Sequence, residues 1–211
     1  MKDLLFNNKF TCVAVSKTKP IEDIEKIYNL GHKDFGENKA QELIGKHQKL
    51  PKDIRWHMIG HLQTNKVKKV VPISYLIHSV DSLKLIKTID KESKKLNKVT
   101  SCLLQINISG EDSKYGLSAE NLKSLVNNNL TNDYRNIQFK GLMGMASFSN
   151  DMDLIKRQFK KLKQLFDEFK EEINDFSILS MGMSNDYRIA LEEGSNMIRI
   201  GSKIFGKRNY L

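Results

Sequence analysis

The residue most able to do chemistry in this chain is a lysine at the end of a short apolar run. Residues 12–20 read Cys-Val-Ala-Val-Ser-Lys-Thr-Lys-Pro, which is typical of a buried strand followed by a helix. Side chains alternate along a strand, so Lys17 shares a face with Val13 and Val15. An amine on an apolar face is costly to desolvate unless it is paired or loses its proton, and an unprotonated lysine is the usual nucleophile for a Schiff base. The segment by itself also fits a strand-end lysine that reaches solvent.

Two turns of glycine and serine near the C-terminus have the chemistry of a phosphate site. Gly182 precedes Ser184, and Gly201 precedes Ser202, so each turn offers a hydroxyl and backbone amides beside a permissive glycine. Either turn alone is weak evidence, because glycine and serine occupy many loops for turn chemistry only. In a barrel the two turns would follow strands seven and eight, where phosphate groups commonly bind.

Arg199 interrupts an apolar run and lies, by alternation, on the face opposite Ile198 and Ile200. Arginine cannot shed its charge, so inside a fold it needs an acceptor. Pointing outward it would pair with Glu192 or Glu193, and pointing inward it could donate to a pyridine nitrogen. An inward lysine, an inward arginine and a phosphate cradle on one face of a barrel would form a pocket for pyridoxal 5'-phosphate (PLP).

The elements that would position these residues alternate between strand and helix. We predict strands near residues 11–16, 33–36, 55–59, 75–79, 102–108, 138–143, 178–181 and 197–200, and helices over 21–30, 39–48, 64–70, 83–96, 119–127, 152–173 and 187–193. Eight such repeats favour a single (β/α)8 barrel of the TIM type. A doubly wound open sheet is the alternative, but it would need a glycine-rich turn after the first strand, where the chain has Ser16, Lys17 and Thr18.

Length and composition limit the possible classes of protein. The 211 residues contain no linker and are expected to form one domain, residues 1–211. Six of the 35 basic residues are arginine and 29 are lysine, so the net charge of +10 is weak evidence for a nucleic-acid partner. Cys12 and Cys102 lie in apolar runs, which suits a reducing cytoplasm, and residues 1–10 fit neither a signal peptide nor a membrane span.

Several longer motifs resemble those of the pyridoxal phosphate homeostasis protein family, whose PLP-binding barrel is similar to the N-terminal domain of alanine racemase (PLP fold type III). The resemblance covers residues 11–206 and rests on VAVSKTKP (13–20), FGEN (35–38), WHMIGHLQTNK (56–66), HSVD (78–81), GLM (141–143), MGMS (181–184) and RIGS (199–202). One departure is that family members usually carry a longer helix before the first strand.

The resemblance implies a role for each matching residue. Lys17 forms the internal aldimine with PLP, and Arg199 faces the ring nitrogen. The other implied positions are the phosphate ligands Ser184, Gly201 and Ser202, and the residues around the cofactor, Asn38, Ser79 and Met143. The implied function is to hold or supply PLP in vitamin B6 and amino-acid homeostasis, without efficient turnover, with PLP-dependent apoenzymes as possible recipients. We expect a monomer that binds neither nucleic acid nor membranes.

Two other functions remain open at this stage. A racemase-type PLP enzyme would need a base on each side of the substrate Cα, and a Schiff-base aldolase would need an acid-base partner beside Lys17. His57, His61 and His78 lack the carboxylate grouping of a zinc site, so we expect them to pack beside the barrel mouth. Residues 112–117 are expected to form a loop at that mouth.

Overall fold

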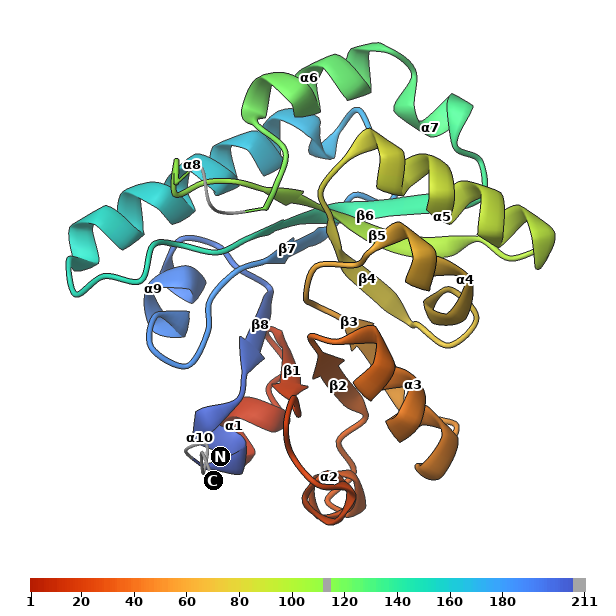
Figure 1. Ribbon diagram of the computed structural model, residues 1–211. Helices are drawn as coiled ribbons and strands as arrows, with labels where there is room; N and C mark the ends of the chain where they lie inside the picture. Colours follow the sequence, from red (N-terminus) through yellow and green to blue (C-terminus); the bar gives the residue numbers. More distant parts are fainter. Residues whose placement is uncertain (112–114, 207–211) are drawn as a thin grey trace.

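Eight parallel strands close into a barrel in the computed structural model, which describes residues 1–111 and 115–206 (Figure 1). The strands follow one another in chain order, and β1 pairs with β8 to close the ring. Their bounds are β1 Thr11–Val15, β2 Asp34–Glu37, β3 Arg55–Met58, β4 Leu76–Val80, β5 Thr100–Ile106, β6 Ile137–Gly144, β7 Ile178–Ser180 and β8 Met197–Ile200. The predicted (β/α)8 barrel is therefore confirmed, with strand ends shifted by up to a few residues.

Helices surround this barrel on its outer side (Figure 1). The helices that the periodicity predicted are α2 Ile21–Asn29, α3 Ala40–Lys49, α5 Leu83–Lys95, α6 Ala119–Asn127, α8 Met152–Lys170 and α9 Tyr187–Glu192, while the segment predicted as one helix over 64–70 comprises η1 Thr64–Lys66 and α4 Val67–Val70. The additional short helices are α1 Lys2–Leu5, α7 Leu130–Asp133 and α10 Ser202–Phe205. Each is four residues long, too short for a hydrophobic period to register.

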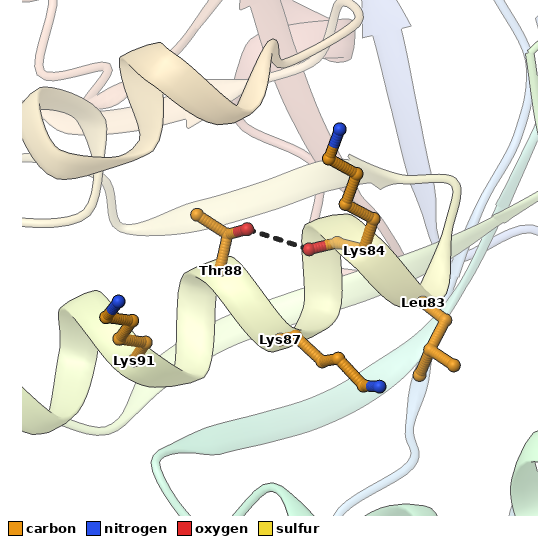
Figure 2. A pocket seen from close by; sticks show the side chains of 5 residues that line it. All are labelled: Leu83, Lys84, Lys87, Thr88 and Lys91. Atoms are coloured by element: carbon orange, nitrogen blue, oxygen red, sulfur yellow. Dashed lines mark hydrogen bonds between the residues drawn. The ribbon is translucent and has the colours of Figure 1, made fainter.

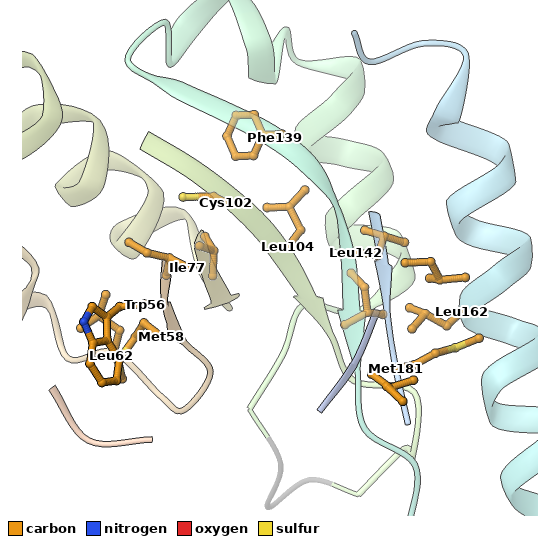
Figure 3. Packing of buried hydrophobic residues seen from close by; sticks show 14 of the residues in the cluster. Trp56, Met58, Leu62, Ile77, Cys102, Leu104, Phe139, Leu142, Leu162 and Met181 are labelled. Carbon is orange, nitrogen blue, oxygen red and sulfur yellow. The ribbon is translucent and has the colours of Figure 1, made fainter. Parts of the chain in front are cut away.

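The longest helix shows why these elements form. The carboxylate of Asp151 accepts a hydrogen bond from the Leu154 amide (2.9 Å) and caps α8. One face of α8 is buried against the barrel, including Phe159, Leu162 and Phe166. Figure 3 shows part of this outer layer, where Leu142 and Met181 lie near Leu162. The apolar stripe of α8 is therefore structural core.

Alternation along the strands creates a second, smaller core inside the barrel. Val13 packs there with Leu76, Leu103, Met143 and Met197, whereas residues on either side of Val13 in the chain belong to the outer layer. The alternation of β1 therefore places Val13 inside the barrel. The segment after β1 leaves the strand at its carboxyl end, which is the mouth of the barrel.

The short N-terminal segment packs on the outside of the first strand. Helix α1 contacts β1 with Leu5 buried, and the ring of Phe6 meets the ring of His32 edge-on at 6.2 Å.

Cys12 and Cys102 are buried free thiols, and burial raises the pKa of Cys12 to about 12. Within residues 1–111 and 115–206, no helix combines the length and apolar character needed to cross a membrane.

Candidate active site: the mouth of the barrel

A cavity of about 670 Å³ lies at the carboxyl ends of the strands. Barrel sites are built at this end, because the loops that leave the strands converge there. The predicted site residues that line the cavity are Lys17, Asn38, Ser184, Arg199, Gly201 and Ser202. These six residues come from the ends of β1, β2, β7 and β8 and line one cavity, as the sequence analysis expected.

A strained turn holds Lys17 at the edge of this cavity. Thr18, which follows the half-buried lysine, has a φ of 64°, a left-handed conformation that a β-branched residue rarely adopts. Two hydrogen bonds keep the turn in place: the Thr18 amide donates to Glu42 Oε1 (2.6 Å), and the Lys19 amide donates to the Ser16 carbonyl (3.0 Å). The Lys19 ammonium also lines the cavity and donates to the Phe205 carbonyl of α10 (2.9 Å).

Beneath this turn lies a buried ion pair that the sequence analysis missed. The Lys46 ammonium donates to Glu37 Oε1 (2.8 Å), to Glu42 Oε1 (2.7 Å) and to the Ser16 carbonyl (2.8 Å). The Ser16 hydroxyl donates to the same Glu37 oxygen (2.6 Å). Burial raises the pKa of Glu37 to about 7, because the cost of desolvating the carboxylate exceeds the stabilisation from Lys46 and Ser16. The one available signal was a glutamate inside the short strand that contains Phe35.

Arg199 points into the barrel. Its Nη1 donates to the Ser180 carbonyl (2.9 Å) and to Ser180 Oγ (2.7 Å), and its Nη2 donates to the Gly144 carbonyl (3.0 Å). These contacts rule out the outward pairing with Glu192 or Glu193. Burial lowers the pKa of Arg199 to about 10, so the guanidinium stays charged at neutral pH.

The two glycine turns differ in what their glycines do. Gly182 has a φ of 95°, and an added Cβ would lie 2.6 Å from the Cβ of Ala190, so this glycine is needed for the turn and for the packing of α9. An added Cβ at Gly201 would meet only ordinary contacts, the nearest being the Val15 carbonyl oxygen at 3.4 Å. Backbone strain therefore gives no reason for glycine at position 201, whereas close approach of a ligand would.

Two predicted cofactor neighbours do not line the cavity. The Ser79 hydroxyl donates to the carbonyl of Gly60 (2.6 Å), and Gly60 is the residue that faces the space. Met143 lies deeper, in the small core inside the barrel. Both residues stand behind the cavity wall, because strand alternation and the loop after β3 place other groups in front of them.

Two of the three histidines occupy different positions from those expected. His61 lies at the mouth, where its Nδ1 is 2.8 Å from Asp81 Oδ2 and its ring stacks on Tyr115 at 4.0 Å. His57 and His78 are instead fully buried inside the barrel, so the expected position beside the mouth is wrong for these two. No group of three potential metal ligands exists within the parts of the chain that the structure describes.

The loop prediction over 112–117 is only partly testable. Residues 112–114 lie outside the described residues, and Tyr115 lines the cavity, with its carbonyl accepting from Gln105 Nε2 (2.8 Å). Gln105 could have been noticed as a polar residue within an apolar strand. The stretch 145–150 also lines the cavity but has no chemical signal in the sequence.

A second hollow, on the outer surface of α5, is lined by Leu83, Lys84, Lys87, Thr88 and Lys91. Figure 2 shows the lysine side chains diverging from one helix, with the Thr88 hydroxyl donating to the Lys84 carbonyl (2.8 Å). Diverging side chains of one charge on a single helix do not form a site, so the barrel mouth is the candidate.

Comparison with known proteins points to one family. The family model described as alanine racemase, N-terminal domain, matches residues 1–209. A pyridoxal phosphate homeostasis protein from Aquifex aeolicus is 41% identical over 200 residues, which cover 94% of this chain and 87% of the relative. The human protein of the same name is 39% identical over 211 residues, covering 94% of this chain and 76% of that protein. The chain belongs to the pyridoxal phosphate homeostasis protein family.

Solved structures extend the likeness to this family. PipY of Synechococcus elongatus, in a structure described as having PLP bound, superimposes with a TM-score of 0.86 at 31% identity, covering 95% of this chain and 94% of PipY. The same protein without PLP gives a TM-score of 0.88. Alanine racemase of Clostridium difficile shares only the fold, with a TM-score of 0.78 at 14% identity, and this chain covers 55% of it.

Proposed function

We propose that this chain binds PLP in the cavity at the barrel mouth and holds or supplies it in vitamin B6 and amino-acid homeostasis. The observation that carries the proposal is that Lys17 and the buried, charged Arg199 line the same cavity. Lys17 follows β1, and Arg199 lies on the neighbouring strand β8. Relatives named for PLP homeostasis, and a PLP-bound PipY structure, support it.

The residues present fit this cofactor. Contacts within the described residues use three N–H groups of Arg199, which leaves donors for a ring nitrogen in the cavity. Ser184, Ser202 and the amides beside Gly201 offer neutral donors for phosphate oxygens. The apolar side chain of Ile59 lines the same space and suits the face of a ring.

Each residue would then have one task. Lys17 would hold the aldehyde carbon covalently, Arg199 would donate to the ring nitrogen, and Asn38 would lie beside the cofactor. When bound, PLP supplies an aldehyde that condenses with amines and a ring that withdraws electrons. A guanidinium at the ring nitrogen donates a hydrogen bond without transferring a proton, which weakens the ring as an electron sink. The arrangement therefore suits storage and delivery rather than catalytic turnover.

Delivery by direct contact with other proteins would use the apolar side chains that the mouth exposes. Phe148 is 96% exposed and Met152 is 50% exposed, and both line the cavity. Large apolar side chains exposed together mark interaction sites. We propose that a monomer of this chain, acting in the cytoplasm, presents this rim to PLP-dependent apoenzymes.

Reduction with borohydride tests covalent binding directly. PLP added to wild-type protein should become fixed to Lys17, identified by peptide mass spectrometry, and Lys17→Ala should abolish the fixed label. Lys19→Ala is the matched control, because Lys19 lines the same cavity from the same turn and should leave the label in place. Recovery of the pyridoxyl group on Lys19 of the wild type would refute the site. Rapid racemisation or transamination of amino acids would refute the non-enzymatic role.

A further inference from the structure

A hydrogen-bonded chain crosses the inside of the barrel and ends at Arg199. Ser180 Oγ, which accepts from Arg199, lies 3.2 Å from His78 Nδ1. His78 Nε2 lies 2.9 Å from His57 Nδ1, and His57 Nε2 lies 3.0 Å from Asp34 Oδ1. All five residues are at most 5% exposed, and they come from β2, β3, β4, β7 and β8, so the hydrogen-bonded chain crosses the barrel interior between β4 and β7.

The available donors and acceptors allow the protons of this hydrogen-bonded chain only one arrangement. Asp34 needs a donor, because hydrogen bonds from His57 and Arg55 outweigh burial and hold the pKa of its carboxyl below the ordinary value. His57 therefore carries its proton on Nε2, and its bare Nδ1 accepts from His78 Nε2–H. The bare Nδ1 of His78 then accepts the Ser180 hydroxyl proton.

The opposite polarity leaves a proton without an acceptor. If His57 were an imidazolium, its Nδ1–H would donate to His78 Nε2, and His78 Nδ1–H would then donate to Ser180 Oγ, so the Ser180 hydroxyl proton would need another acceptor. Among the described residues no further acceptor for the Ser180 hydroxyl is present at hydrogen-bond distance. Burial lowers the pKa of His78 well below its ordinary value, and the charge of Arg199 adds to this, so His78 itself is neutral.

The partners of Arg199 affect the charge that a ligand in the cavity experiences. The hydrogen-bond acceptors of Arg199 in the described structure are two carbonyls and a hydroxyl, all neutral. Asp34, the carboxylate that completes the chain, lies on β2, which only β1 separates from the strand of Arg199, and it makes no direct hydrogen bond to Arg199. Neutral acceptors therefore hold the guanidinium in place, while the nearby carboxylate of Asp186, which also lines the cavity, partly counters the effect of burial on the pKa of Arg199.

We propose that Ser180, His78, His57 and Asp34 form a positioning relay that aims Arg199 at the acceptor atom of the ligand ring. This inference rests on the proposed function, because it takes the ligand ring to be that of PLP. His57 and His78 are positioning residues, since they act only through Ser180 and Arg199.

The test compares PLP with an analogue in which carbon replaces the ring nitrogen. Wild-type protein should bind PLP more tightly. Ser180→Ala, which removes the hydroxyl but keeps the backbone carbonyl, should lose about tenfold in affinity for PLP and little for the analogue, the effect of one charge-assisted hydrogen bond. His78→Gln, which loses the Ser180 contact but can still donate toward His57, should act in the same way and covers the case in which one variant folds poorly.

Ser93→Ala is the matched control. Ser93 is as buried as Ser180 and forms a 2.7 Å hydrogen bond to Thr100 Oγ1, away from the cavity lining. This variant should keep the preference for PLP. Equal loss of both ligands in the relay variants, or an unchanged preference, would overturn the relay. A wild type that binds both ligands equally would instead overturn the placement of Arg199 at the ring, and the relay with it, whereas a wild type that binds neither would overturn the proposed function.

A second measurement needs no ligand. Nitrogen-15 shifts of the histidine side chains in the unliganded protein at neutral pH should show His57 and His78 as neutral Nε2–H tautomers. An imidazolium at His57, or a proton on Nδ1 of His78, would overturn the assigned direction even if PLP binds.

Discussion

Glu37 offers the sharpest test of the electrostatics beneath the Lys17 turn. Its carboxyl is completely buried, its Oε1 accepts from Ser16 and Lys46, and its Oε2 has no hydrogen-bond partner within the described residues. Burial raises its pKa from 4.5 to about 7. Because the folded-state pKa is the higher one, the stabilising effect of the bound proton is full below pH 4.5 and is lost as the pH rises through 7.

The magnitude of the loss follows from the two pKa values. The raised pKa of Glu37 corresponds to roughly 3 kcal/mol at about 1.4 kcal/mol per pKa unit. Between about pH 5 and about pH 8.5 the expected loss is roughly 2 to 3 kcal/mol, because part of the titration lies below that window. Glu37→Gln does not titrate, so this loss should disappear. Its amide oxygen can still accept from Ser16, and Lys46 keeps Glu42 and the Ser16 carbonyl as partners.

Urea unfolding followed by circular dichroism at the two pH values measures this difference. Relative to Glu37→Gln, the free energy of unfolding of the wild type should fall by roughly 2 to 3 kcal/mol at the higher pH. Glu171→Gln is the control, because Glu171 is exposed and should follow the wild type. A Glu37→Gln variant that loses as much stability as the wild type would refute the raised pKa and with it our account of this ion pair.

The phosphate turns allow two further predictions. Changing Ser184 and Ser202 together to alanine should weaken the binding of PLP by about tenfold or more and the binding of pyridoxal little, because only PLP presents the anion to those hydroxyls. Titration of the protein with both ligands checks this. Equal weakening of both would refute the phosphate assignment. Gly201→Ala should also weaken the binding of PLP while leaving the urea midpoint unchanged, since its added Cβ meets no clash. Gly182→Ala should instead cost about 1 kcal/mol or more of stability, because of the positive φ of Gly182 and the close Ala190 Cβ. A large loss of stability in Gly201→Ala would show that the glycine is structural.

Local sequence patterns predicted much of this site because the relevant signals lie within single strands. The period of two placed Lys17 on the face of Val13 and placed Arg199 on the face opposite Ile198 and Ile200, and the structure shows that Val13 and Arg199 lie inside the barrel. The turns that carry Ser184 and Ser202 follow strands seven and eight, as expected for a barrel. The resemblance to the homeostasis family added Asn38, Ser79 and Met143, of which only Asn38 lines the cavity.

The sequence by itself determined the barrel, the lysine at the end of the first strand and the strand face of Arg199, because alternation and strand order are local or topological properties. Whether that face is the inner one was decided by the tertiary structure. The sequence did not reveal that Lys46 lies beneath the Lys17 turn or that His57 and His78 bond to each other inside the barrel. Those contacts join residues on different elements, and each side chain alone looks like an ordinary surface or packing residue. Only the closed tertiary structure decided them, because closure of the ring removes water from the interior and leaves buried polar groups no partners except one another.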